Sequence, residues 1–246
     1  MFNYQVLIEY AGTNFVGWQK QKNGRSVQQT IEKVFSKILK EKIILLGSGR
    51  TDAGVHAIAQ SAHFNIKSKI KNEFYILNSV NFFLNKKNIS ILKIKKKNLD
   101  FHARFSAKKR EYIYIIVNRM APLSLEFNRA WNVKSNLNLN LMKKAANLLK
   151  GKKDFSTFRS SSCSARSPIK TLDEVKVKKL GDKIVIIFKS RSFLQQQVRS
   201  MVGCIKYVGE EKWNLQKFKN IINSKKRANC APPAPAHGLY LLNVSY

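Results

Sequence analysis

A single carboxylate, Asp52, stands in the glycine-rich stretch Gly47–Ala57, whose sequence is GSGRTDAGVHA. The order Thr-Asp-Ala-Gly permits a turn in which the carboxylate accepts backbone N–H bonds, so Asp52 could be a turn or cap residue. Arg50 favours a second interpretation, because side chains two residues apart leave an extended segment on the same side and a guanidinium keeps a carboxylate ionised. An ionised, ordered aspartate can act as a nucleophile. The spacing leaves both interpretations open.

Nucleotide-binding loops do not fit this stretch. A G-x-G-x-x-G loop for a dinucleotide or a methyl donor would need glycine where Asp52 stands, and a carboxylate there would repel a pyrophosphate. The phosphate-binding pattern G-x-x-x-x-G-K-[ST] does not occur in the chain. The sequence therefore predicts chemistry without a nucleotide cofactor.

Metal chemistry has equally little support. The cysteines are odd in number and far apart, with no C-x-x-C pair and no histidine at zinc-finger spacing, so we expect reduced thiols and no metal. Three histidines stand beside apolar residues and are expected to have structural roles: His56, His63 and His102.

The formal net charge of +32 indicates a polyanionic partner, with nucleic acid favoured over an anionic membrane surface. Lysine runs such as Lys95–Lys97 and Lys225–Arg227 are interpreted as solvated faces. The sequence has neither an apolar run of eighteen residues nor a signal-peptide core in its first ten residues. We therefore expect a cytoplasmic protein with no membrane partner.

Apolar periodicity predicts an α+β fold. Strands are expected at residues 4–10, 58–66, 89–96, 111–117, 172–180, 183–189 and 239–245. Helices are expected at residues 27–39, 72–84, 138–150, 193–208 and 214–223. Gly181-Asp182 is a two-residue hairpin signal between two of the strands. The two halves share a strand-then-helix plan, so we expect two similar α/β subdomains with mainly antiparallel sheets flanked by helices, at 1–106 and 107–246.

Four blocks of sequence resemble the tRNA pseudouridine synthase A (TruA) family. They are GSGRTDAGVHA at 47–57, FHARFSAKKREYIYII at 101–116, QQVRSMVG at 196–203 and PAHGLYLLNVSY at 235–246. The blocks follow the order that the family shows and span nearly the whole chain. The R-T-D-A-G-V-H block is the most specific of them.

The resemblance implies a cofactor-free isomerase whose nucleophile is Asp52, in a cleft between the two subdomains. Arg199 would pair with Asp52 and keep it deprotonated, Tyr112 would lie against the target base, and Leu239 would complete the apolar wall of the pocket. Arg50 would assist extrusion of the base, since guanidinium is a poor acid. Taken alone, Tyr112 and Leu239 could be core residues and Arg199 an ordinary solvated helix residue.

The resemblance also implies the substrate and the assembly. The substrate would be tRNA, at uridines 38, 39 and 40 of the anticodon stem-loop, and the protein would work as a homodimer. Flexible serine and arginine suit contacts to phosphate. The residues expected to contact tRNA are Phe101, His102, Ala103, Arg104, Phe105, Arg159 and Arg166.

One block departs from the family pattern. Where the family commonly shows F-L-H-H-M-V-R, this chain has F-L-Q-Q-Q-V-R at 193–199, so Gln195 and Gln196 replace two histidines. Glutamine keeps the hydrogen bonding of histidine but not its titration. The sequence leaves open how this replacement affects RNA contact and pH response.

Two other functions are compatible with parts of the sequence. A non-catalytic RNA-binding protein would explain the charge and the interleaved aromatics, but not the Arg50/Asp52 pair. An RNA methyltransferase would need a methyl-donor loop that is absent. For the isomerase, the sequence does not decide whether Asp52 attacks C6 of the base or acts at the sugar.

Overall fold

The computed structural model describes residues 1–246, which its contacts divide into two units. The first unit contains Met1–Lys108 together with Tyr240–Tyr246, and the second contains Lys109–Leu239. Both units combine a sheet with helices, so the predicted α+β class is confirmed. The roles expected for the subdomains 1–106 and 107–246 stay predictions.

The sheet of the first unit has the strand order β4-β1-β3-β10, and β2 also pairs with β3. Its strands are β1 (Phe2–Tyr10), β2 (Leu46–Gly47), β3 (His56–Ile66), β4 (Ile89–Lys97) and β10 (Leu239–Ser245). β1 is antiparallel to both β3 and β4, whereas β10 is parallel to β3. The last strand of the chain therefore completes the unit that begins with the first strand.

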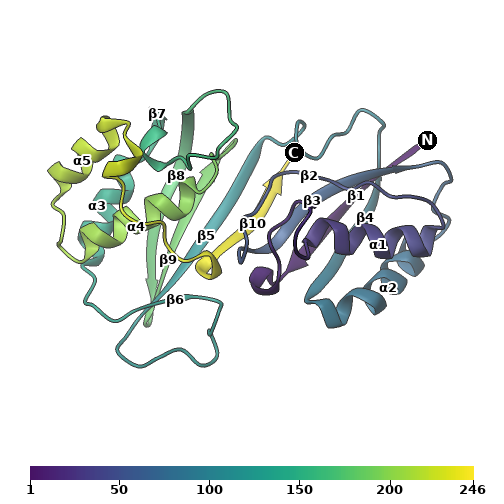
Figure 1. Ribbon diagram of the computed structural model, residues 1–246, viewed down its shortest axis with the longest axis horizontal. Coiled ribbons are helices and arrows are strands. Elements are labelled where there is room, and N and C mark those ends of the chain that lie inside the picture. Colours follow the sequence, from purple (N-terminus) through teal and green to yellow (C-terminus); the bar gives the residue numbers. More distant parts are fainter. The chain divides into compact units, whose positions relative to one another are not determined.

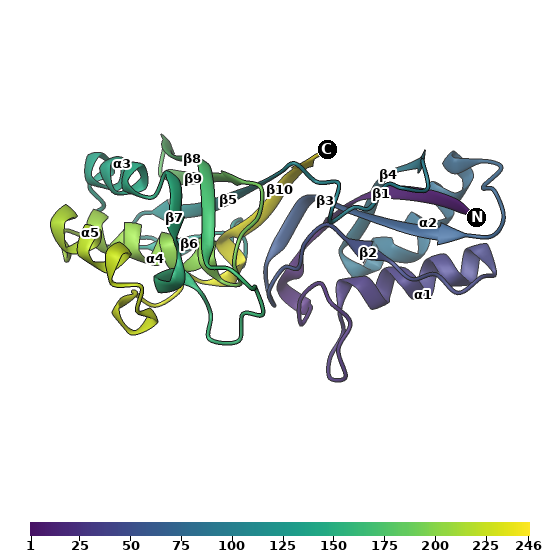
Figure 2. The same cartoon turned by 90° about the horizontal axis from the view of Figure 1, so that it is seen from above.

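Two helices, α1 (Val27–Leu39) and α2 (Glu73–Leu84), lie on the same side of this sheet in both views (Figure 1, Figure 2). The Ser26 side chain caps α1 by accepting a hydrogen bond from Gln29 N. The buried stripe of α1 includes Phe35, whose ring lies 5.1 Å from that of Phe64 on β3. This packing forms the core of the unit.

The sheet of the second unit has the order β5-β9-β8-β7, and β6 pairs in parallel with β5. Its strands are β5 (Lys109–Asn118), β6 (Trp131–Val133), β7 (Gly151–Asp154), β8 (Ile169–Leu180) and β9 (Lys183–Ser190). The remaining strand pairs are antiparallel, and β8 and β9 form the hairpin that Gly181-Asp182 predicts. β7 (GKKD) contains no apolar residue, so periodicity could not predict it.

Three helices belong to the second unit: α3 (Leu139–Leu148), α4 (Gln197–Gly209) and α5 (Leu215–Ser224). α3 packs against α4, α5 and β8 (Figure 1). The helix expected from residue 193 begins only at Gln197, because Gln196 has the left-handed φ of 61° and lies in a turn that the bond from Gln197 N to the carbonyl oxygen of Leu194 closes at 3.1 Å. Gln195 lies in the same turn, and its carbonyl oxygen accepts a hydrogen bond from Ser160 N at 3.1 Å.

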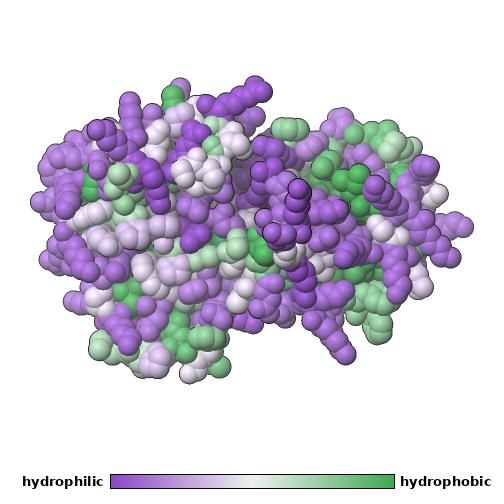
Figure 3. All heavy atoms as spheres, in the orientation of Figure 1, coloured by the Kyte–Doolittle hydropathy of each residue, from purple (hydrophilic) through white to green (hydrophobic).

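Hydrophilic side chains cover most of the face shown in Figure 3, as the net charge of +32 requires. No helix has both the length and the apolar character that crossing a bilayer demands. No group of three His, Cys, Asp or Glu side chains is arranged to hold a metal ion. The three cysteines are free thiols: Cys163, Cys204 and Cys230.

Candidate active site

Asp52 lies in a tight turn just before β3. Its carbonyl oxygen accepts a hydrogen bond from Val55 N at 3.2 Å, and Gly54 supplies a φ of 78°. The flanking Thr51 and Val55 are buried, whereas Asp52 itself is half-buried. Asp52 thus lies in a turn that its carbonyl oxygen closes, and the acceptance of backbone N–H bonds by its carboxylate stays a prediction.

Residues 17 and 18 hold the N-terminal side of this turn. Trp18 N donates to the carbonyl oxygen of Thr51 at 3.1 Å, and the hydroxyls of Tyr10 and Thr51 are hydrogen-bonded at 2.8 Å. At Gly17 the backbones approach so closely that a Cβ would lie 2.7 Å from the Thr51 oxygen. Only glycine fits there, and its φ of 111° is one that other residues rarely adopt.

Gly12 holds the C-terminal side of the turn in the same way. Its N–H donates to Nδ1 of His56 at 3.0 Å, and a Cβ on it would lie 2.0 Å from the carbonyl oxygen of Val55. The ring of His56 also stacks on Tyr240 of β10 at 4.7 Å. His56 therefore has the structural role expected of it.

A third set of bonds fixes the approach to Arg50. Ser48 N donates to the carbonyl oxygen of Ser61 at 2.7 Å, and its hydroxyl donates to Oε1 of the fully buried Gln60. The amide of Gln60 then donates to the carbonyl oxygen of Gly49 at 2.9 Å. Arg50 follows directly and is exposed. Nothing in the sequence identifies this brace, because the burial of Gln60 is visible only in the structure.

The other predicted chemical residues belong to the second unit. Tyr112 on β5 is 8% exposed, and its ring meets that of Phe193 edge-on at 5.2 Å. Leu239 is the buried first residue of β10. Arg199 lies on α4, where its Nε donates to the carbonyl oxygen of Ala234 at 2.7 Å. Asp52 and Arg50 belong to the first unit, so the pairing of Asp52 with Arg199 stays a prediction.

The segment 101–105 divides into buried and exposed residues. Ala103 is fully buried: its N–H donates to Nδ1 of His63 at 3.1 Å and its carbonyl oxygen accepts from the Tyr246 hydroxyl at 2.9 Å. Phe101 packs against the Tyr246 ring at 4.9 Å. Arg104 and Phe105 are exposed, and the guanidinium lies 5.5 Å from the Phe105 ring centre.

His63 and His102 both accept hydrogen bonds from the backbone of this segment. Nδ1 of His102 accepts a hydrogen bond from Arg104 N at 3.1 Å, and its ring lies 4.6 Å from that of His63. Burial, followed by the nearby His102, lowers the pKa of His63, while a hydrogen bond with the backbone of Leu46 acts in the opposite direction. The neutral ring of His63 is thus favoured.

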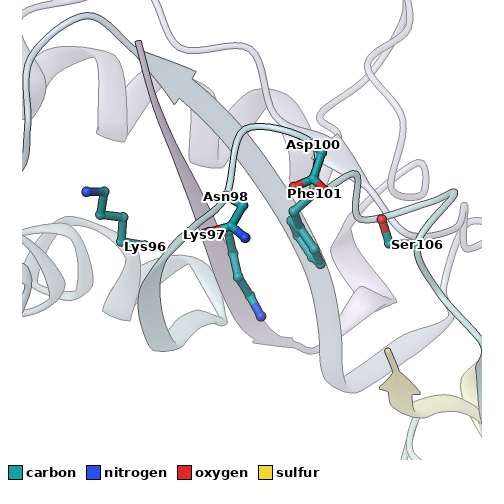
Figure 4. A pocket seen from close by; sticks show the side chains of 6 residues that line it. All are labelled: Lys96, Lys97, Asn98, Asp100, Phe101 and Ser106. Atoms are coloured by element: carbon teal, nitrogen blue, oxygen red, sulfur yellow. The ribbon is translucent and has the colours of Figure 1, made fainter.

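A shallow pocket of about 390 Å³ lies beside this segment, in the first unit. Its lining combines cationic, polar and aromatic side chains: Lys96, Lys97, Asn98, Asp100, Phe101 and Ser106. Lys97 and Phe101 run side by side in it (Figure 4), and the ammonium group lies 4.9 Å from the centre of the ring. None of the residues expected to do chemistry lines this pocket, whereas Phe101, which is expected to contact tRNA, does.

The serine-rich loop after β7 carries two further predicted contact residues. Arg159 is half-buried and its Nη2 donates to the carbonyl oxygen of Cys163 at 2.7 Å, which closes the loop on itself. Arg166 is exposed. The side chain of Gln195 joins the same loop through the Ser162 hydroxyl at 3.4 Å. The glutamine that replaces a family histidine therefore contacts this loop.

Comparison with known proteins defines the class of this chain. A family model described as tRNA pseudouridine synthase matches residues 6–106 and 145–246. A tRNA pseudouridine synthase A from Pelagibacter ubique (strain HTCC1062) is 60% identical over 246 residues, which is all of both chains. Proteins of the same name from Parvibaculum lavamentivorans and Maricaulis maris are 45% and 40% identical over 246 residues, covering all of this chain and 100% and 98% of theirs.

The chain therefore belongs to the tRNA pseudouridine synthase A family, as the four sequence blocks predicted. It is an isomerase of the tRNA-modifying class.

Proposed function

We propose that this enzyme converts uridines 38, 39 and 40 of the tRNA anticodon stem-loop to pseudouridine, with Asp52 as its nucleophile. The construction of the turn around Asp52 supports the assignment most directly. Hydrogen bonds and close backbone approaches from Gly12, Gly17 and Trp18 fix the turn on both sides, and the carboxylate-bearing residue is left half-buried. A reacting group must be held in one geometry, and a plain surface turn needs no such bracing.

The reaction conserves every atom of the nucleotide. The N1–C1′ bond breaks, the uracil turns within the site, and a C5–C1′ bond forms. C5 loses its proton and N1 gains one, so nothing is oxidised and no donor group is consumed. The ionised Asp52 serves either by attack at C6 of the base or by action at the sugar, and Arg199 supplies the cation that keeps it ionised.

The target base has to leave the stack before Asp52 can reach it. In this proposal Tyr112 lies against the flipped base, Leu239 forms the apolar wall, and Arg50 fills the space or grips the phosphate left behind. Tyr112 is suited to the task because Phe193 locks its ring edge-on. The exposed Arg104, Phe105 and Arg166 supply tRNA contacts.

Two further properties belong to the proposal. The enzyme acts in the cytoplasm, where its substrate class resides, and it works as a homodimer. A strictly monomeric mass at working concentration, together with full activity, would contradict the second of these.

The decisive experiment compares Asp52→Asn with the wild type in single-turnover assays at saturating enzyme. Asparagine fits the same turn but lacks the charge, so pseudouridine formation should vanish while tRNA binding persists. Asp182→Asn is the matched control, because Asp182 lies in the β8–β9 hairpin turn and pairs with Arg119. Turnover like the wild type by the Asp52 variant would overturn the proposal.

The positions are tested separately, with tRNAs that carry a single uridine at 38, 39 or 40 and cytidine at the other two. Each substrate should gain one pseudouridine at its remaining uridine. Modification elsewhere in the tRNA, with the single remaining uridine of each substrate left unmodified, would show that the site of action is assigned wrongly.

A further inference from the structure

The proline-rich segment 231–238, here called the strap, lies directly across α4. At Gly203 a Cβ would lie 2.2 Å from the carbonyl oxygen of Pro232, so the strap touches the helix backbone at that point. Ala231 and Ala234 are buried at 3% and 1% exposure. Prolines restrict φ and stiffen such a segment, so a contact that fixes one end of the strap also limits the movement of the other end.

One turn before Gly203, the strap and α4 are joined at Arg199 by two hydrogen bonds. Ala234 N donates to the carbonyl oxygen of Arg199 at 3.0 Å, and Nε of Arg199 donates to the carbonyl oxygen of Ala234 at 2.7 Å. A guanidinium is planar and its five donors form a rigid fork. Fixing Nε therefore fixes the direction in which both Nη nitrogens point.

Beyond Ala234 the strap is anchored to β5 by Tyr114. The fully buried Tyr114 donates its hydroxyl proton to the carbonyl oxygen of Pro235 at 2.8 Å. Gly238 closes over the same ring, because a Cβ there would lie 2.6 Å from the Tyr114 Cζ. The carbonyl group of Ala234, which binds Arg199, is thus adjacent in the chain to the carbonyl group of Pro235, which binds Tyr114.

We infer that Tyr114 is a positioning residue: its hydroxyl fixes the strap at Pro235, the strap fixes the Ala234 carbonyl, and that carbonyl aims the guanidinium of Arg199. The inference rests on the proposed role of Arg199 as the charge partner of Asp52. It assigns a task in the reaction to a tyrosine that sequence spacing alone would leave in the core.

The electrostatics of Tyr114 agree with this assignment. Burial raises the pKa of Tyr114, and the nearby charge of Arg199 lowers it by a smaller amount. The hydroxyl therefore stays protonated and remains a donor to Pro235 at any working pH. Tyr114 thus positions the strap and does not transfer protons.

The test is Tyr114→Phe, which removes one oxygen and keeps the packing of the ring. Single-turnover rate at saturating enzyme should fall about 3- to 10-fold, the range expected for one lost hydrogen bond, while the tRNA dissociation constant stays unchanged. Tyr4→Phe is the matched control, because Tyr4 is 1% exposed in the first unit and its hydroxyl also forms one internal hydrogen bond, here as the acceptor from Ile70 N at 3.0 Å. Tyr4→Phe should lose as much thermal stability as Tyr114→Phe but should keep the single-turnover rate of the wild type.

A double-mutant cycle with Arg199→Lys separates positioning from general damage to the fold. Lysine has no Nε–H to give to Ala234, so Tyr114→Phe should cost no further rate in that background. Gly238→Ala provides a second route to the same effect, since it keeps the hydroxyl but displaces the strap from the ring. It should lower the rate with tRNA binding intact.

Rates of Tyr114→Phe equal to those of Tyr4→Phe, or full additivity with Arg199→Lys, would overturn the inference. If either of these contradicting outcomes is found while Asp52→Asn is inactive, only the inferred role of Tyr114 is wrong, and the proposed function stands. An active Asp52→Asn would instead remove the proposed function itself.

Discussion

The backbone of Thr51 lies so close to Gly17 that it excludes any side chain at position 17. A Cβ at Gly17 would lie 2.7 Å from the Thr51 carbonyl oxygen and 3.3 Å from the carbonyl carbon of Asp52. The turn that presents Asp52 is therefore shaped by a residue 35 positions earlier in the chain.

Gly17→Ala should displace this turn and abolish most of the activity. The left-handed backbone alone costs about 1–3 kcal/mol with a side chain, and the clash moves the Asp52 peptide as well. Single-turnover assays and thermal unfolding measure the two effects. Gly151→Ala is the control, because Gly151 has a φ of 92° but a Cβ added there would meet no atom within 4 Å, so this variant should lose stability and keep its rate. Equal single-turnover rates for Gly17→Ala and Gly151→Ala would show that the close approach of Gly17 to Thr51 is not needed for activity.

Arg166→Ala and Arg159→Ala should behave differently although both arginines lie in one loop. Loss of the exposed Arg166 should weaken tRNA binding and reduce the log–log salt slope by about 0.7 to 0.9, as expected for one phosphate contact. Loss of Arg159 removes the bond to Cys163 and should loosen the loop, which proteolysis at low protease concentration would report. An unchanged salt slope for Arg166→Ala would exclude it from phosphate contact.

The segment 101–105 should show the same division between binding and stability. Arg104→Ala and Phe105→Ala should raise the tRNA dissociation constant and leave thermal unfolding nearly unchanged, because both residues are exposed. Phe101→Ala should lower stability by about 1–3 kcal/mol, since its ring packs on Tyr246. Filter binding and urea unfolding of the three variants would distinguish these outcomes, and a large stability loss in Phe105→Ala would contradict them.

Mild acid should destabilise the first unit through His63. Its pKa is lowered in the folded state, first by burial and then by His102, so the folded protein favours the neutral ring. The stability that this preference contributes is complete above the unfolded pKa, about 6.5, and is lost as the pH falls from there through the folded pKa. Urea unfolding at about pH 7.5 and 5.5 measures the loss.

His63→Gln is the variant that isolates this effect, because glutamine can accept the Ala103 N–H bond but does not titrate. Its unfolding free energy should depend less on pH than that of the wild type. His237→Gln is a useful comparison, since burial also lowers the pKa of His237, in the second unit. An identical pH dependence in wild type and His63→Gln would rule out His63 as the source.

Locally encoded elements could be predicted from the sequence. Helix α1 occupies the predicted residues 27–39, because both its apolar stripe and its Ser26 cap are written in consecutive residues. The β8–β9 hairpin follows in the same way from Gly181-Asp182. The start of α4 was predicted four residues early, because the loop contact of Gln195 with Ser160 joins residues 35 apart in the chain.

The candidate site also combines residues that the local sequence identifies with residues that only tertiary contacts bring to it. Asp52 could be identified because its motif is contiguous, whereas the residues that brace its turn could not. Tyr10, Gly12 and Gln60 carry no signal of their own, and their contacts with the turn arise only when β1 and β3 pair. The strap was visible as a proline-rich segment, but its contact with Arg199 depends on tertiary packing.

The return of the chain end to the first unit sets an order for biosynthesis. Tyr240 and Leu241 pair with β3, and the hydroxyl of Tyr246 bonds both Ser61 and Ala103. On the ribosome, the segment that bears Asp52 emerges before residues 240–246 and cannot obtain these partners until those residues have left the exit tunnel. Asp52, the proposed nucleophile, is therefore synthesised well before residues 240–246, and the fold around it closes only after they have emerged.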